Sequence, residues 1–212
     1  MELPPYYPIL DTALLERRGC GAAEAVAALI EGGARIVQFR HKGHFSRAVF
    51  AAAEEAAGLC RRHGVVFIVD DRADVAKLLE AGVHLGQEDL PPTAARRILG
   101  DSAVIGFSTH NQRQLEAARE EPVDYVALGP IFSTQSKERP DPVVGVEKLR
   151  AWRKLTDRPL VAIGGITRAK ARAVLEAGAD SVAVIADAWP EPCTPEQIRR
   201  RTQEWVAVTS GR

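Results

Sequence analysis

Apolar runs alternate with helical patterns along the whole chain. The runs carry few polar residues at alternate positions, which is typical of strands that are covered on both faces. The segments between them, such as residues 22–32 and 46–64, are rich in Ala, Leu, Glu and Arg and favour helices. The predicted strands span residues 6–10, 34–39, 65–69, 83–86, 103–108, 124–129, 159–164 and 180–185.

This order of elements predicts a parallel α/β architecture. Eight strands and about eight helices in βα order indicate a single-domain (β/α)₈ TIM barrel over residues 1–212, with a doubly wound open sheet as the alternative. A weak repeat supports the barrel, since Glu-x-Gly ends a helix before a strand in residues 29–39, 78–87 and 174–184. A glycine just past a helix can adopt the left-handed cap conformation.

Composition narrows the class of protein. Lys plus Arg and Asp plus Glu both total 28, so no basic surface indicates a nucleic-acid partner or a membrane surface. The first 20 residues do not resemble a signal peptide, and no run approaches the roughly 18 apolar residues of a membrane span. The three cysteines lack a metal-binding spacing and favour reduced thiols. We expect a soluble cytoplasmic protein, and a homo-oligomer is compatible with this composition.

Two cations stand at the end of the predicted strand 34–39. Gln38, Arg40 and Lys42 alternate there, and alternate residues of a strand project to the same side. An unpartnered buried cation is costly, so an anion belongs beside Arg40 and Lys42. That anion comes either from the protein or from a ligand.

In a parallel barrel the active site lies at the C-terminal ends of the strands. The residues that follow the predicted strands there divide into cations and carboxylates, which together suggest a polyanion held through a divalent metal. Taken singly, each would fit a rim salt bridge worth about 0–1 kcal/mol. From the second strand to the eighth, these residues are Arg40-His41-Lys42, Asp70-Asp71-Arg72, Gln87-Glu88-Asp89, Ser108-Thr109-His110, a segment ending in Lys137, Gly164-Gly165 and Ile185-Ala186-Asp187.

The carboxylates suit Mg²⁺. This ion prefers oxygen ligands and commonly uses one or two carboxylates plus substrate phosphate, which Asp71 and Asp89 on neighbouring strand ends could supply. A second anion site is indicated by Gly164 and Gly165, because backbone N–H groups before a helix bind phosphate. A tight turn would explain the two glycines equally well. Two anion sites imply two phosphorylated substrates or one that is doubly phosphorylated.

Six segments of the chain resemble the thiamine-phosphate synthase (thiamine-phosphate pyrophosphorylase) family. Two of them, GVHLGQEDLP and GPIFSTQSK, are highly specific, and the resemblance extends over about residues 35–188. It implies a (β/α)₈ barrel that joins a hydroxymethylpyrimidine diphosphate to a thiazole phosphate, releases pyrophosphate and requires Mg²⁺. The segments are QFRHK, VDDRADVAKLLEAGVHLGQEDLP, IGFSTH, DYVALGPIFSTQSK, AIGGI and DSVAVIADA.

The resemblance also implies roles for individual residues. Asp71 and Asp89 match the metal ligands, and Arg40, Lys42, Lys137 and Ser108 match the residues that act on the leaving diphosphate. The implied pyrimidine-diphosphate contacts are Gln38, Phe39, Arg40, His41, Lys42, Asp70, Ser108 and Lys137. The implied thiazole-phosphate contacts are Thr134, Gln135, Ser136, Gly165, Ile185 and Ala186.

Two positions depart from the family pattern. Asp70 stands where the family usually has Asn, so an acceptor replaces a donor beside the diphosphate; it could instead add a carboxylate to the metal site. Ala186 stands where Ser is common, which removes a hydroxyl. Two other functions stay open. One is a thiazole tautomerase, a metal-free paralogue with a histidine where His110 stands, and the other is a non-catalytic phosphometabolite-binding paralogue.

Overall fold

The strands close into a barrel. The computed structural model describes residues 2–134 and 141–211, and within them eight parallel strands pair in chain order, with β8 paired to β1. The sequence prediction of a (β/α)₈ barrel is therefore confirmed, and the open sheet is ruled out because Tyr6 lies opposite Val182. The strands are β1 Tyr6–Asp11, β2 Ile36–Arg40, β3 Val66–Asp70, β4 Gly82–Leu85, β5 Ile105–Thr109, β6 Tyr125–Leu128, β7 Leu160–Ile163 and β8 Ser181–Val184.

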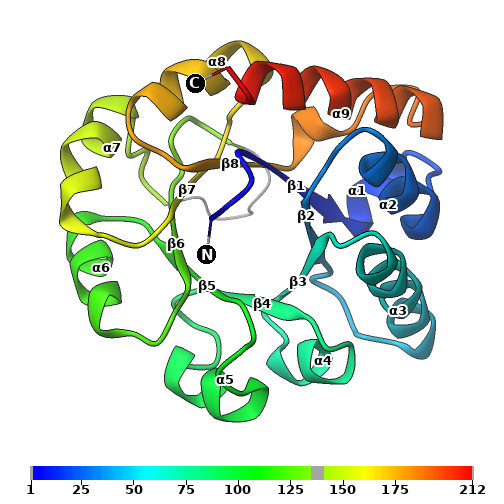
Figure 1. The fold of residues 1–212 in the computed structure, drawn as a ribbon, viewed down its shortest axis with the longest axis horizontal. Coiled ribbons are helices and arrows are strands. Elements are labelled where there is room, and N and C mark those ends of the chain that lie inside the picture. The colour runs from blue at the N-terminus through cyan, green and yellow to red at the C-terminus, as the bar shows by residue number, and fades with distance from the viewer. Residues whose placement is uncertain (1, 135–140, 212) are drawn as a thin grey trace.

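Helices surround the barrel (Figure 1). Each strand leads into at least one helix or 3₁₀ turn, and the predicted segments 22–32 and 46–64 correspond to α2 and α3. The α-helices are α1 Thr12–Arg17, α2 Ala22–Glu31, α3 Arg47–Arg62, α4 Ala73–Leu78, α5 Pro92–Leu99, α6 Gln112–Ala117, α7 Val146–Trp152, α8 Arg168–Glu176 and α9 Pro195–Thr209. The 3₁₀ turns are η1 Ala118–Glu120, η2 Arg153–Leu155 and η3 Ala186–Ala188. No helix among the described residues has the length and apolar character needed to cross a membrane.

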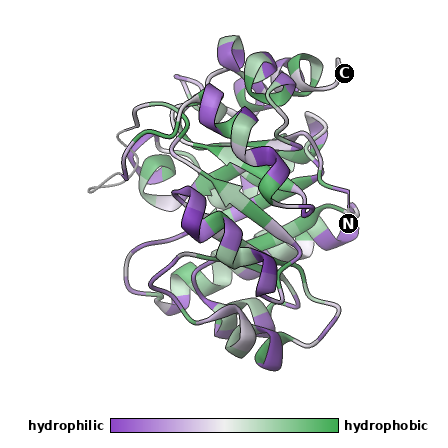
Figure 2. Cartoon of the chain, turned by 90° about the vertical axis from the view of Figure 1, so that its left-hand side faces the viewer, coloured by the Kyte–Doolittle hydropathy of each residue, from purple (hydrophilic) through white to green (hydrophobic). Residues whose placement is uncertain are grey.

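The strands bury both faces. Figure 2 shows the hydrophobic strands inside a layer of helices whose outer surfaces are hydrophilic. One face of each strand packs against the helices, as Leu10 and Val37 do, and the other fills the barrel interior, as Tyr7 and Ile68 do. This two-sided burial explains why the strands read as apolar runs without alternation.

The last helix completes the ring. Helix α9 lies beside α2 in Figure 1, and Tyr6 of β1 stacks on Trp205 of α9 with ring centroids 5.2 Å apart. A Cβ on Gly32, which caps α2, would lie 2.5 Å from the Cβ of Thr202. Glycine at this position therefore permits the close approach of α9.

Inside the barrel, a glycine makes room for an aromatic ring. A Cβ on Gly106 in β5 would lie 2.0 Å from Cζ of Tyr125 in β6, so the ring of Tyr125 crosses the space that a side chain would fill. Tyr125 is fully buried and contacts the neighbouring Tyr7 ring edge-on. The absence of a side chain at Gly106 thus determines how the barrel interior packs.

Two glycine-to-alanine substitutions should change stability in opposite directions. Gly106→Ala forces Tyr125 to move and should lower the free energy of unfolding by about 1–3 kcal/mol or more, the usual cost of overpacking. Gly58 lies inside α3, where an added Cβ would meet only the end of the Arg62 side chain. Gly58→Ala should therefore raise the free energy of unfolding by about 0.5–1 kcal/mol. Urea unfolding followed by circular dichroism measures both. Equal effects of the two variants would contradict the packing described here.

Candidate active site

Charged side chains from β1, β2 and β3 meet at the C-terminal end of the barrel. Asp11 lies opposite Arg40 in the strand register, and the Arg40 guanidinium donates to the Asp11 carboxylate. The Arg40 Nε lies 3.6 Å from Oδ2 of Asp70. The Lys42 Nζ lies 2.7 Å from the same Asp70 oxygen and also donates to Asp71. The anions that the sequence requires beside both cations are therefore supplied by the protein in this structure.

Asp11 was not predicted from sequence. It ends β1, and its other carboxylate oxygen accepts from the backbone N–H of Leu14, so it also caps helix α1. The predicted rim residues follow the second to the eighth strands. Applying the same rule to the strand at residues 6–10 would have identified this carboxylate.

Asp70 is the most buried of these acids, with 7% of its surface exposed. Burial, followed by repulsion from Asp71, raises the pKa of the Asp70 carboxyl to about 6, although Lys42 and Arg40 oppose that shift. Burial lowers the pKa of Lys42, but attraction to Asp70 and Asp71 outweighs burial and raises it overall. The ammonium group of Lys42 therefore stays charged, and Asp70 holds its negative charge at a cost.

Asp71 and Asp89 face each other across the ends of β3 and β4. Asp71 has a φ of 62°, a strained conformation for a residue other than glycine, and its N–H donates to the carbonyl of His84 at 2.8 Å. One oxygen of Asp89 accepts from the N–H of Gly86 at 2.6 Å. Burial raises the pKa of Asp89, the hydrogen bond from the Gly86 N–H opposes that shift, and the charge of Asp71 adds to it, so the pKa is raised overall. Each of the two acids is thus held by its backbone surroundings while their charges repel.

The donor set fits Mg²⁺. The described part of the site holds four carboxylates, Asp11, Asp70, Asp71 and Asp89, against the two cations Arg40 and Lys42, which leaves a surplus of two negative charges. A divalent cation would neutralise this surplus. The described residues form no cluster of three or more acidic, His or Cys side chains able to enclose a metal. Two carboxylates with open positions for water and phosphate match the ordinary coordination of Mg²⁺.

The predicted strand-two residues do not all face this cluster. The side chain of Gln38 points into the barrel, where its Nε2 donates to the Tyr7 hydroxyl at 3.1 Å. Phe39 faces the other way and packs against Phe45 and Phe67 beneath the helices. The Phe39 side chain therefore lies on the helix side of β2, because neighbouring residues of a strand point to opposite faces, and the implied contact of Phe39 with the diphosphate stays a prediction.

His41 is also held away from the charged cluster. Its Nδ1 hydrogen-bonds the Thr12 hydroxyl at 2.8 Å, and its Nε2 hydrogen-bonds the carbonyl of His44 at 3.1 Å. The ring also packs edge-on against Phe45. These contacts give the His41 ring a structural role at the start of the loop that follows β2.

Ser108, at the end of β5, is tied to a histidine that was not predicted as a site residue. Nε2 of His84 lies 2.9 Å from the Ser108 hydroxyl, and Gln87 donates to the Ser108 carbonyl at 2.6 Å. His84 lies on β4, next to β5 in the sheet. The pairing of β4 with β5 is what brings His84 to Ser108.

The glycine pair after β7 is required by its surroundings. Gly164 and Gly165 have φ values of 97° and 63°, and a Cβ on Gly165 would lie 2.3 Å from the carbonyl oxygen of Ser133. Within the described residues, the N–H groups of Gly165 and Ala186 donate to no protein acceptor. Ala186 begins the 3₁₀ turn η3 after β8, and Ile185 is the N-cap residue of that turn. Backbone N–H groups that converge in this way can bind an anion.

Part of the prediction lies outside the described residues. Gln135, Ser136 and Lys137 fall in residues 135–140, so their places in the site stay predictions. Thr134 is the last described residue before that range. The described parts on either side are joined, since the N–H of Val144 donates to the carbonyl of Pro130 at 2.8 Å.

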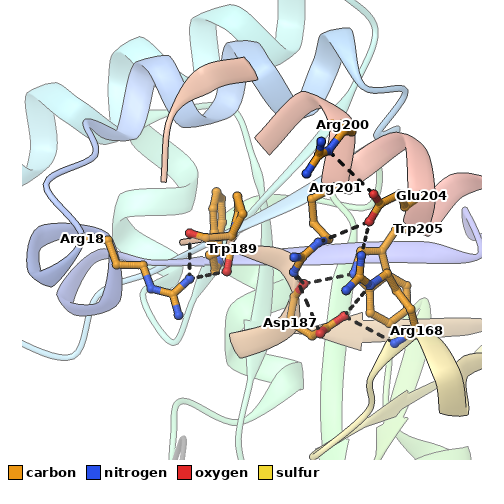
Figure 3. Close-up of polar contacts among 9 residues, drawn as sticks. Arg18, Arg168, Asp187, Trp189, Arg200, Arg201, Glu204 and Trp205 are labelled. Carbon is orange, nitrogen blue, oxygen red and sulfur yellow. Dashed lines mark hydrogen bonds and ion pairs between the residues drawn. The ribbon is translucent and has the colours of Figure 1, made fainter. Parts of the chain in front are cut away.

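A network behind β8 fixes the turn that carries Ala186 (Figure 3). The backbone carbonyl of Asp187 accepts from Arg201 at 2.9 Å and from the indole of Trp205 at 3.2 Å. The Asp187 carboxylate accepts from the N–H and Nε of Arg168 at 3.3 and 3.1 Å. Thr167 occupies the N-cap position of α8 without a side-chain capping bond, and the Asp187 carboxylate instead accepts from the backbone N–H at the start of the helix.

His110 lies at the end of β5, as the tautomerase alternative requires. Its Nδ1 lies 2.7 Å from the carbonyl of Gly129 and 3.5 Å from the carboxylate of Asp141. Its backbone N–H donates to the Gln114 side chain at 2.7 Å. These contacts orient the ring through Nδ1 and anchor it to the segment after β6.

Asp70→Asn should strengthen the binding of inorganic pyrophosphate. The substitution removes a negative charge beside Lys42 and Arg40, and we expect the Kd in the presence of Mg²⁺ to fall about tenfold. Asp74→Asn is the matched control, because Asp74 is exposed and pairs with Arg72 at 2.8 Å. Titration calorimetry gives both constants. An unchanged or weaker affinity in Asp70→Asn alone would show that this carboxylate does not oppose the anion.

Comparison with known proteins agrees with this geometry. Residues 6–188 match the family model described as thiamine monophosphate synthase. The chain is 43% identical to a thiamine-phosphate synthase of Koribacter versatilis over 98% of this chain and 97% of that protein. It is 42% identical to the Chloroflexus aurantiacus thiamine-phosphate synthase over 84% and 82% of the two chains.

A solved structure gives the same result. The thiamine phosphate pyrophosphorylase from Pyrococcus furiosus superposes with a TM-score of 0.84 at 32% identity, and the match covers 98% of this chain and 96% of that one. The fold, the strand-end residues and these similarities agree. The chain belongs to the thiamine monophosphate synthase family.

Proposed function

We propose that this enzyme joins a hydroxymethyl-aminopyrimidine diphosphate to a thiazole phosphate and releases thiamine phosphate and pyrophosphate. The observation that carries the proposal is the meeting of Arg40 and Lys42 with Asp71 and Asp89 at one end of the barrel of a chain in this family. Its partners are then two small phosphorylated substrates. We place the reaction in the cytoplasm, where soluble metabolites of this kind are available.

The diphosphate would bind by taking the place of protein carboxylates beside Arg40 and Lys42. Arg40 can present a guanidinium fork to two phosphate oxygens, and Lys42, about half-exposed, can move from Asp70 and Asp71 to a third. Asp71 and Asp89 would hold Mg²⁺, which supplies charge neutralisation for the leaving diphosphate. Ser108 at the end of β5 would donate a further hydrogen bond, and Lys137 is predicted to add another cation.

The reaction then needs little proton transfer. The thiazole nitrogen attacks the pyrimidine methylene with its lone pair, and the C–O bond to the diphosphate breaks with its electron pair leaving on pyrophosphate. The attacking nitrogen carries no proton, so the residues of the site chiefly position the two substrates and stabilise charge. Gln38 would contact the polar edge of the pyrimidine. The N–H groups of Gly165 and Ala186 would bind the thiazole phosphate.

The carboxylate pair favours this function over the alternatives. An isomerase that acts on the thiazole alone needs no metal site, so it needs neither Asp71 nor Asp89. A protein that only binds phosphometabolites has no need of the strained backbone at Asp71. His110 is the feature that an isomerase would use. The assay below separates all three functions.

Purified protein given both substrates and Mg²⁺ should release one pyrophosphate for each thiamine phosphate formed, and chelation with EDTA should stop the reaction. A coupled pyrophosphate assay and chromatographic detection of thiamine phosphate measure the two products. Isomerisation of the thiazole alone that is insensitive to EDTA would assign the isomerase. Tight binding of both substrates without turnover would assign the binding protein.

Asp89→Asn should weaken Mg²⁺ binding by about 100-fold, since even disturbing a residue that supports a metal ligand typically costs about 10–100-fold. Asparagine keeps the side-chain oxygen that accepts from the N–H of Gly86, so the turn should survive. Glu88→Gln removes one negative charge from the exposed neighbouring residue and serves as the control. The Mg²⁺ dependence of thermal stability and of turnover gives the affinity. If both variants respond to Mg²⁺ alike, Asp89 is not a ligand.

A further inference from the structure

Five polar side chains form a continuous chain of hydrogen bonds through the barrel interior. Gln38 Nε2 donates to the Tyr7 hydroxyl at 3.1 Å, and the Tyr7 and Tyr125 hydroxyls lie 3.0 Å apart. Tyr125 lies 3.0 Å from Nδ1 of His84, whose Nε2 lies 2.9 Å from the Ser108 hydroxyl. We call these five residues the interior chain. It connects β2, β1, β6, β4 and β5 in that order.

The interior chain is shielded from solvent over most of its length. Gln38, Tyr7, Tyr125 and His84 are between 0% and 8% exposed. Burial raises the pKa of both phenols well above their ordinary range, so each hydroxyl keeps its single hydrogen. A buried donor without an acceptor is unfavourable, because it loses its hydrogen bonds to water and gains none in the protein. Each hydrogen in the interior chain must therefore find an acceptor.

This requirement fixes the direction of the bonds. Because Gln38 donates to Tyr7, the Tyr7 hydrogen must go to Tyr125, and the Tyr125 hydrogen must go to Nδ1 of His84. His84 is then the neutral tautomer with its hydrogen on Nε2, and it donates to Ser108. In the reverse direction Tyr7 would accept from both Gln38 and Tyr125. Its own buried hydrogen would then have no acceptor among the described residues.

The packing around Tyr125 is built to hold this arrangement. The position of Gly106 leaves the space through which the Tyr125 ring reaches His84, since a Cβ there would lie 2.3 Å from the Tyr125 hydroxyl oxygen. The rings of Tyr125 and His84 are nearly parallel, at 23° with centroids 5.6 Å apart. The side-chain positions are therefore fixed independently of the hydrogen bonds.

We propose that His84 and Tyr125 are positioning residues that make the Ser108 hydroxyl a donor toward the diphosphate of the substrate. Because Ser108 accepts from His84, its own hydrogen is directed to an acceptor at the barrel end, and the described residues offer it no other. At the opposite end, Gln38 donates through its nitrogen and keeps its carbonyl oxygen for the amino group of the pyrimidine. The interior chain thus links the contacts to both halves of one substrate. This inference rests on the proposed function, since that function supplies the diphosphate.

The tautomer of His84 tests the direction without any turnover. In protein labelled with ¹⁵N-histidine, long-range correlation spectra distinguish a hydrogen on Nε2 from one on Nδ1, and His84→Gln identifies the signal. We expect the Nε2–H form near neutral pH. A hydrogen on Nδ1 of His84, alone or together with Nε2, would reverse the direction at Tyr125 and overturn the proposal.

Substitution of Tyr125 tests the effect on the anion. Tyr125→Phe keeps the ring and removes the hydroxyl that joins Tyr7 to His84, and we expect about fivefold weaker binding of inorganic pyrophosphate with Mg²⁺. The same substitution made in Ser108→Ala should have no effect on that affinity. Tyr6→Phe is the control, because the Tyr6 hydroxyl is buried on the helix side of the same strand as Tyr7 and takes no part in the interior chain.

The outcomes separate this inference from the proposed function. Pyrophosphate binding that weakens in Tyr125→Phe only when Ser108 is present supports the interior chain, whether or not thiamine phosphate is formed. An equal loss in the Ser108→Ala background, or an equal loss in Tyr6→Phe, would mean that Tyr125 acts through general packing and would overturn the proposal. Absence of thiamine phosphate with pyrophosphate binding intact would count against the proposed function alone.

Discussion

Charge balance at the C-terminal ends of β1 to β4 is the constraint on which this site depends. Arg40 is largely buried and needs an anion beside it, and the fold supplies carboxylates to both Arg40 and Lys42. These carboxylates are Asp11, Asp70 and Asp71. Asp89 makes the acids exceed the cations, and that surplus favours a divalent metal. A phosphate group can then replace carboxylates at the two cations while the metal occupies the remaining acids. The same side chains thus stabilise the folded protein and prepare it for a polyanion.

The barrel interior extends this constraint below the rim. Its residues are both core and site, since Tyr7 and Tyr125 fill the interior and also carry hydrogen bonds between Gln38 and His84. Buried hydroxyl groups are tolerated here because each finds a partner on a neighbouring or facing strand. A barrel filled only with aliphatic side chains would pack as well, but it could not orient a serine at its end.

The sequence was informative wherever function followed from strand order. Apolar runs without alternation predicted strands covered on both faces, and the closed barrel confirms this. The rule that strand ends carry the site predicted that Arg40, Lys42, Asp71 and Asp89 lie close together, and the structure brings them into one cluster. Contacts set by register could not be predicted. The link from His84 to Ser108 depends on how β4 pairs with β5. Phe39 was predicted as a site residue because it lies within the motif QFRHK. Strand alternation turns its side chain to the helices.

Asp70 shows how a single side chain can shift this balance. Its carboxylate lies 2.7 Å from Lys42 and is almost fully buried, so its charge persists only because Lys42 and Arg40 are close. A neutral amide in its place would spare the burial cost and leave Lys42 with Asp71 alone. The acid therefore orders both cations before substrate binds, but it competes with the diphosphate for them. Because Lys42 is half-exposed, it can leave Asp70 when a more highly charged anion arrives, whereas Arg40, more buried and held by Asp11, keeps its place.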